Sequence, residues 1–76
     1  MKEMLEDIVS SIVTKPSEIK INEKTGESGV VILELSVAPE DMGKVIGRRG
    51  KVANSIRTLI KAAASKADRR VIIEIV

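Results

Sequence analysis

The run Gly47-Arg48-Arg49-Gly50, which separates two helical patterns, constrains this chain more than any other feature. Neither glycine carries a Cβ atom, so the backbone can turn tightly here and a second backbone can come close to it. The arginines at the tip, with Lys44 and Lys51 beside them, supply hydrogen-bond donors suited to phosphate oxygens. Backbone N–H groups at the start of the following helix favour an anion at the same place. The run therefore predicts a tight helix–helix connection that can hold a phosphodiester backbone.

The size and composition indicate one domain over residues 1–76 with an aliphatic core. A chain of 76 residues is close to the lower size at which a hydrophobic core suffices for folding. It contains no cysteine, so the 43% of residues that are hydrophobic must supply the stability without disulfides. It also contains no aromatic residue, which leaves Ile, Val, Leu, Met and Ala to form the core.

The first half of the chain predicts one helix and two strands. Apolar residues recur at helical spacing through residues 1–14, and this helix should end before Lys15-Pro16, because proline disfavours helical backbone in the residue before it. Residues 18–22 alternate between polar and apolar side chains, and residues 30–37 are rich in β-branched side chains, so both predict strands. Residues 24–29 predict a turn, and the two strands should pair as an antiparallel hairpin.

The second half predicts two helices and a last strand. A short helix should begin near residue 38 and stop at Gly47, with Glu40 and Asp41 complementing the helix dipole in its first turn. A longer helix should follow Gly50, and residues 71–76 should form the last strand. The longer helix carries apolar residues on or near one stripe: Val52, Ile56, Leu59, Ile60, Ala63 and Ala67. Leu59 lies at the edge of this stripe, where it fits a cap on the core and a self-association contact equally well.

These elements follow in the order α-β-β-α-α-β, which predicts an α+β fold. A right-handed crossover through the two later helices makes the last strand parallel to one of the first two. We expect a three-stranded mixed sheet with all three helices on one face. The other face should meet solvent, which explains Lys20, Glu34 and Glu74.

Charge is distributed unevenly along the chain. Residues 1–42 hold four basic and nine acidic side chains, a balance of −5, whereas residues 43–76 hold nine basic and two acidic ones, a balance of +7. The whole chain is nearly neutral, but a positive field should surround the glycine run.

The segment from Val45 to Ile56 resembles the signature of the KH domain, an RNA- and single-stranded-DNA-binding module. The α-β-β-α-α-β order is similar to its bacterial type II form. The likeness covers the whole chain and is strongest to the small single-domain KH proteins of bacteria, the KhpA family. The residues that carry it are Asp41-Met42-Gly43-Lys44-Val45-Ile46-Gly47 and the later run Ile56-Arg57-Thr58-Leu59.

The resemblance implies a function and a site. In KH domains the G-x-x-G loop clamps the backbone of about four nucleotides of a single strand, and the bases lie across an aliphatic groove. Here the clamp would be Gly47, Arg48, Arg49 and Gly50, with Ile46 and Val52 as candidates for the groove floor and Lys44 and Lys51 adding attraction without reading sequence. The family resemblance also suggests an RNA chaperone or regulator that forms a homodimer or pairs with a larger RNA-binding protein. Arg57 and Lys61 fit a contact surface and a solvated helix face equally well.

Several function classes are excluded. The chain has no His and no Cys, which removes Ser-His and Cys-His nucleophilic sites and ordinary zinc sites. The glycine run is not a P-loop, because Val45 and Val52 stand where that motif needs Gly and Ser or Thr. We expect no enzyme activity, no cofactor and no metal. With no membrane-spanning run and no secretion signal, we expect a cytoplasmic protein without membrane contact.

Two other functions stay open from the sequence. Two helices joined by a short glycine turn are also the outline of a helix-turn-helix DNA-binding protein. A dimerisation module that binds no nucleic acid is the third alternative.

Overall fold

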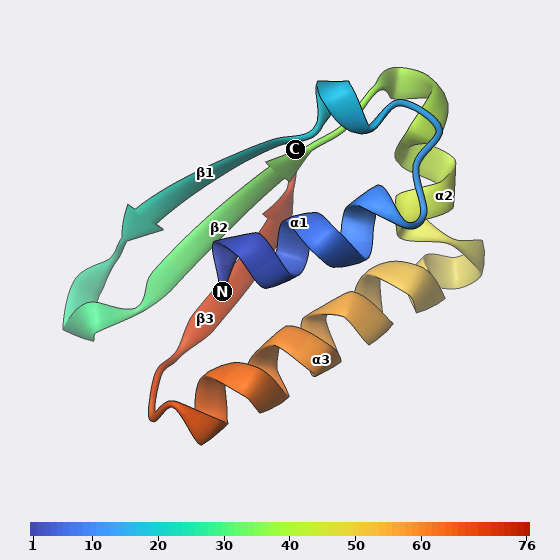
Figure 1. The fold of residues 1–76 in the computed structure, drawn as a ribbon. Coiled ribbons are helices and arrows are strands. Elements are labelled where there is room, and N and C mark those ends of the chain that lie inside the picture. The colour runs from blue at the N-terminus through green and yellow to red at the C-terminus, as the bar shows by residue number, and fades with distance from the viewer.

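The computed structural model describes residues 1–76 and contains the predicted elements in the predicted order (Figure 1). They are α1 (Lys2–Ser10), β1 (Lys20–Thr25), β2 (Val31–Ser36), α2 (Met42–Ile46), α3 (Lys51–Lys66) and β3 (Val71–Ile75). Short 3₁₀ turns lie between them at Pro16–Glu18, Glu27–Gly29, Pro39–Asp41 and Arg48–Gly50. The predicted α+β fold in α-β-β-α-α-β order is confirmed.

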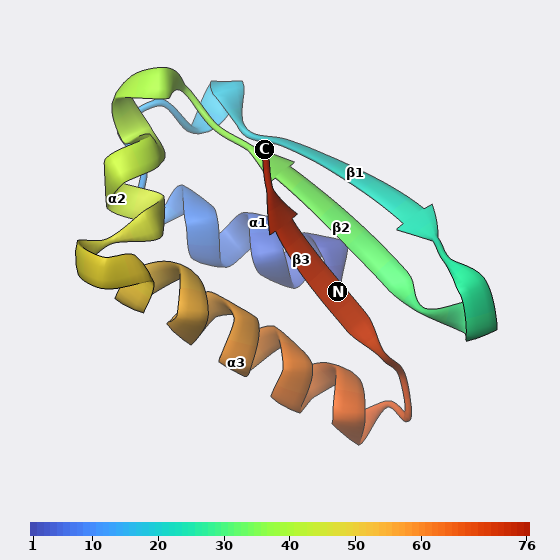
Figure 2. The same cartoon turned by 180° about the vertical axis from the view of Figure 1, so that it is seen from behind.

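The three strands form one mixed sheet in the order β1-β2-β3. β1 is antiparallel to β2, with Lys20 opposite Ser36. β3 is parallel to β2, with Val31 opposite Val71, because the chain crosses through α2 and α3 before it returns to the sheet. Figures 1 and 2 show α1 and α3 side by side on one face of this sheet, with α2 at the end where β2 and β3 finish. The mixed sheet with its helices on one face agrees with the prediction.

The opposite face of the sheet is uncovered (Figure 2). Lys20 and Glu74 are exposed on it, and Glu34 is half-buried beside Lys24, whose Nζ lies 3.2 Å from its carboxylate. Ile72 also reaches solvent here. The prediction that this face meets solvent is confirmed.

Every helix and strand contributes to a single core of eleven buried residues. Apolar side chains of α1, Leu5 and Val9, meet those of the sheet and of α3, and Val45 of α2 closes one end. Because Val45 has no exposed surface, this core also holds the short helix that leads into the glycine run.

The long helix α3 is rotated relative to the predicted stripe. Its buried residues are Ala53, Ile56, Ile60 and Ala64, whereas Leu59 is 52% exposed and Ala67 is exposed beyond the end of the helix. At 3.6 residues per turn the two stripes differ by roughly 50°. Two of the buried positions, Ala53 and Ala64, are alanines, which an apolar count along the helix does not distinguish from its exposed alanines.

The bounds of two elements are sharper in the structure than in the sequence. α1 ends at Ser10, before Lys15-Pro16 as expected; the N–H groups of Ser11 and Ile12 then donate to carbonyls three residues back, and those of Thr14 and Lys15 donate to the carboxylate of Asp41. β1 runs from Lys20 to Thr25 and so starts two residues later than predicted, because a 3₁₀ turn occupies Pro16–Glu18. It also ends later than predicted, because its pairing with β2 continues to Thr25.

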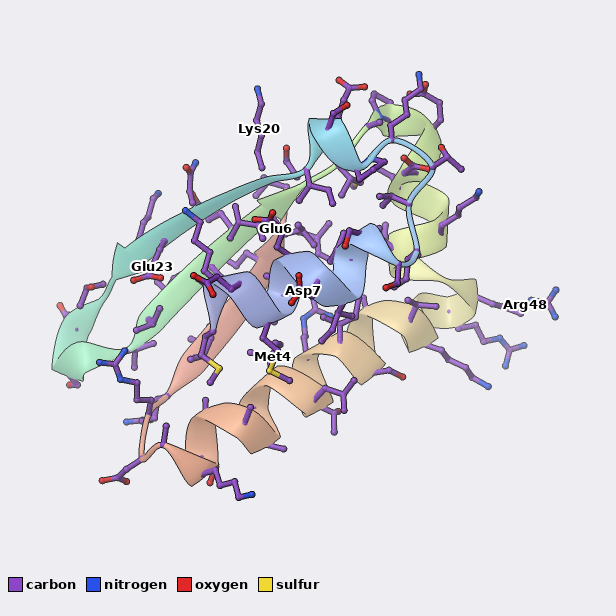
Figure 3. All side chains as sticks on the ribbon, in the orientation of Figure 1. Met4, Glu6, Asp7, Lys20, Glu23 and Arg48 are labelled. Atoms are coloured by element: carbon purple, nitrogen blue, oxygen red, sulfur yellow. The ribbon has the colours of Figure 1, made fainter.

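One acidic residue lies in an apolar row of the sheet. Glu23 is opposite Leu33, which is opposite Ile73, so these three side chains share the face that the helices cover. Leu33 and Ile73 are buried, but Glu23 is exposed at the outer edge of β1, and its side chain is labelled in Figure 3.

Candidate nucleic-acid interface

The loop from Gly47 to Gly50 has an unusual backbone. Gly47 ends α2, since its N–H donates to the carbonyl of Gly43 at 2.9 Å, and the N–H of Gly50 donates back to the carbonyl of Gly47 at 3.2 Å. Gly47, Arg49 and Gly50 have φ angles of +75°, +57° and +73°. Three of the four loop residues therefore lie in the half of conformational space that L-residues avoid.

Gly47 is required by contact as well as by conformation. A Cβ atom at this position would lie 2.3 Å from Cγ2 and 2.9 Å from the backbone N of Val52, the second residue of α3. At Gly50 the nearest atom would be Nδ2 of Asn54, 4.0 Å away, so only the positive φ favours glycine there. The two glycines thus bring the loop directly against the first turn of α3.

The loop presents cations that form no ion pair. Lys44, Arg48, Arg49 and Lys51 are all exposed, and none of them takes part in either of the two ion pairs, Lys15–Glu40 and Lys24–Glu34. In Figure 3 the side chain of Arg48 extends away from the body of the molecule. Arg49 keeps a left-handed conformation that costs a non-glycine residue about 1 kcal/mol or more. Backbone strain of this kind is typical of functional loops.

Two apolar side chains flank the glycines. Ile46 is 39% exposed, so it is not an ordinary core residue, while Val52 is half-buried against the core and next to Gly47. All eight predicted site residues therefore lie within one short segment at the junction of α2 and α3.

Arg57 lies further along α3 and connects it to the free edge of the sheet. Its Nε donates to the carbonyl of Ile73 at 3.3 Å, and its Nη1 donates to Oδ1 of Asn54 at 3.1 Å. Lys61, the other residue considered with it, is exposed and forms no ion pair. Sequence reasoning did not single out Asn54, although its spacing of three residues from Arg57 on a helix is a usable signal.

An open hollow follows the exposed side of α3. It is lined by Lys51, Asn54, Ser55, Thr58 and Leu59. It begins at the first residue after the glycine run, so it adjoins the loop.

Asp41 has a role beyond the predicted one. It lies in the first turn with Glu40, as expected, but its carboxylate caps no helix N–H and accepts hydrogen bonds from Thr14 and Lys15. No spacing rule links positions so far apart in the sequence.

The chain belongs to the family described as KhpA/KhpB, KH domain, which matches residues 2–75. This confirms the predicted family and agrees with the prediction that the chain is not an enzyme. A protein of Clostridium acetobutylicum named RNA-binding protein KhpA is 57% identical over 76 residues, the full length of both chains. Its namesake in Clostridium perfringens is 53% identical over the same span. A third protein of that name, from Borreliella burgdorferi, is 52% identical over 73 residues, which cover 96% of this chain and 88% of the relative.

No group of three or more His, Cys, Asp or Glu residues is placed to hold a metal ion. None of the helices has the length and apolar character needed to cross a membrane.

Proposed function

We propose that this protein binds single-stranded RNA and that the Gly47–Gly50 loop clamps the RNA backbone. The observation that carries the proposal is the loop itself, in which three positive φ angles fold the backbone against the start of α3 and leave two arginines exposed and unpaired. Relatives named RNA-binding protein KhpA match the chain over its full length, which supports RNA as the ligand.

In this mechanism Arg48 and Arg49 donate to phosphate oxygens, while Lys44 and Lys51 add longer-range attraction. Phosphate and sugar can approach the loop at Gly50, where the missing Cβ atom leaves open space, whereas at Gly47 that space is filled by Val52. Ile46 and Val52 provide the aliphatic floor under the bases. The chain lacks aromatic rings to stack on, so binding should be weak, dependent on salt and tolerant of sequence.

Single strands fit this site better than duplex DNA. A helix-turn-helix protein inserts the N-terminal residues of its second helix into the major groove. Here that end of α3 carries Val52, which is half-buried, and Ala53, which is only 4% exposed. These side chains are committed to packing against the protein and are not free to read base edges.

The test is the double variant Arg48→Asp/Arg49→Asp, with Arg69→Asp/Arg70→Asp as the matched control. Both variants change the net charge from +2 by the same amount, and all four positions are exposed. The two pairs flank opposite ends of α3, which are roughly 24 Å apart at 1.5 Å per residue. Affinity is measured by fluorescence anisotropy with a labelled single-stranded RNA of mixed sequence, and folding by circular dichroism.

The RNA affinity of the loop variant should fall to background. The control should lose only as much affinity as the change in net charge causes. In the parent protein log affinity should fall with log salt at a slope between roughly −2 and −4, since about four phosphates contribute about −0.7 each. Equal losses in both variants, or tighter binding to a duplex than to the single strand, would contradict the clamp.

We further propose that the protein acts as an RNA chaperone or regulator in the cytoplasm and pairs with itself or with a larger RNA-binding partner. Support for pairing comes from Leu59, which is 52% exposed beside the small side chains of the hollow along α3. One groove holds about four nucleotides, so two linked grooves would raise the effective concentration on one RNA.

A further inference from the structure

Asp41 is the only charged residue buried in the protein, with 1% of its surface exposed. Oδ1 accepts hydrogen bonds from the backbone N–H of Thr14 at 3.0 Å and from its hydroxyl at 2.9 Å. Oδ2 accepts one from the backbone N–H of Lys15 at 3.1 Å. The Thr14 N–H is the main reason why the pKa of the Asp41 carboxyl lies below its ordinary range, although burial acts against it. We call these three residues the Asp41 clasp.

The Asp41 clasp joins two parts of the chain that are far apart in sequence. On one side is the connection between α1 and β1, and on the other is the residue directly before α2. Figure 1 shows that connection passing alongside the start of α2. An exposed ion pair between Lys15 and Glu40 lies next to the clasp, but a surface pair of this kind contributes little to stability.

The helix between the clasp and the RNA loop is short. α2 has five residues, too few for a helix to be stable without tertiary contacts. Its buried anchors are Asp41 at the start and Val45 near the end, and Gly47 follows directly. Asp41 and Gly47 are separated by about 9 Å along the helix axis at 1.5 Å per residue. A shift at the start of α2 therefore moves the first glycine of the loop.

We propose that Asp41 is a positioning residue for RNA binding: by clasping Thr14 and Lys15 it sets where α2 begins and thereby where the Gly47–Gly50 loop lies. This inference rests on the proposed function of that loop. The carboxylate does not touch RNA, because it is buried and its charge would repel phosphate. Its effect on binding is indirect, and it makes the connection between α1 and β1 part of the RNA-binding apparatus.

The test compares Asp41→Asn with Glu40→Gln, which removes the same charge at the adjacent, exposed position. The side-chain amide introduced by Asp41→Asn would keep an acceptor for Thr14 but place an NH₂ group against the N–H of Lys15. The milder variant Thr14→Val deletes the hydroxyl and keeps both backbone donors. For each protein we would measure thermal unfolding, the amide signals of Gly47 and Gly50 in ¹⁵N–¹H NMR spectra, and RNA affinity at a temperature where it is folded.

Electrostatics and positioning predict opposite results. Removing a negative charge should tighten RNA binding slightly, and Glu40→Gln should do so with the glycine signals unchanged. Asp41→Asn should instead weaken binding by roughly three- to tenfold, the effect of about one net hydrogen bond, and shift both glycine signals. Thr14→Val should shift the same signals in the same direction by a smaller amount.

The inference is overturned if folded Asp41→Asn binds RNA like Glu40→Gln and leaves the glycine signals in place. If Asp41→Asn does not fold, Thr14→Val decides on the same two measurements. If instead the proposed function is wrong, Arg48→Asp/Arg49→Asp will still bind RNA. In that case the glycine signals of Asp41→Asn and Thr14→Val still show whether the Asp41 clasp positions the loop.

Discussion

Replacing each glycine of the loop by alanine should destabilise the protein by very different amounts. Both positions have a positive φ, but Gly50 lies in the left-handed helical region with ψ of 14°, whereas Gly47, with ψ of 176°, lies in a region open almost only to glycine. Gly50→Ala should therefore cost about 1–2 kcal/mol, for conformation alone. Gly47→Ala carries a conformational cost of up to about 3 kcal/mol and a steric cost in addition.

The steric cost comes from Val52. The new Cβ atom would lie 2.3 Å from Cγ2 and 2.8 Å from Cβ of Val52, so the two side chains cannot both stay in place. A β-branched residue in a helix has one strongly preferred rotamer, so Val52 cannot simply turn away. Overpacking of this kind costs about 1–3 kcal/mol, which brings the total for Gly47→Ala to roughly 2–6 kcal/mol. A domain of this size has only about 4–11 kcal/mol of stability at roughly 0.05–0.15 kcal/mol per residue.

The assay is thermal and urea unfolding followed by far-ultraviolet circular dichroism, because the chain has no Trp or Tyr for fluorescence. At about 4–8 °C per kcal/mol, Gly50→Ala should lower Tm by roughly 4–16 °C, and Gly47→Ala should lower it by roughly 8 °C at least and by more than Gly50→Ala in the same buffer. Adding Val52→Ala to Gly47→Ala should restore part of the loss, so the two substitutions should be non-additive. Equal destabilisation by the two glycine substitutions, or strict additivity with Val52→Ala, would refute the close contact between Gly47 and α3.

Three more outcomes follow from residues described above. Arg49→Gly should raise stability by about 1 kcal/mol, because glycine adopts the positive φ of this position without strain, and it should weaken RNA binding in the same affinity assay. The control is Asp68→Gly, at φ +57° beyond α3, which should raise stability by a similar amount and leave RNA binding unchanged. The pKa of Asp41 is lowered in the folded state, so its contribution to the free energy of unfolding is complete above the unfolded-state pKa of about 4 and is lost as pH falls through the folded-state pKa. In urea unfolding measured at several pH values, Asp41→Asn should therefore lose less stability on acidification than the parent protein. Leu59→Lys should sediment as a folded monomer with weaker binding to long RNA and near-normal binding to a tetranucleotide, and a parent protein that is monomeric at high micromolar concentration would rule out pairing through α3.

Local patterns were sufficient to predict the order of the elements. The period of two in residues 30–37, the helical spacing in residues 1–14 and the glycines at 47 and 50 are signals carried by near neighbours. The parallel β3 followed from the handedness of crossover connections. The Gly47–Gly50 loop was also found in this way, because its charge and its glycines are contiguous.

Features that depend on distant contacts were not predicted. The buried face of α3 includes Ala53 and Ala64, and the helix's own pattern of apolar residues did not distinguish them from its other alanines. The course of the chain after α1 depends on hydrogen bonds from Thr14 and Lys15 to Asp41, which lies in the second half of the chain. From the sequence, Asp41 resembled an ordinary first-turn acid.

The position of Glu23 bears on whether the sheet can be extended by another molecule. An exposed edge strand is a template on which a neighbouring chain can add a strand of its own, and such pairing leads to aggregation. Glu23 lies on the helix-covered face at the outer edge of β1, opposite buried Leu33. A strand added beside β1 would bring a further side chain against this carboxylate and take water away from it. An inward-facing charge at this place therefore disfavours such pairing and keeps β1 as the end of the sheet.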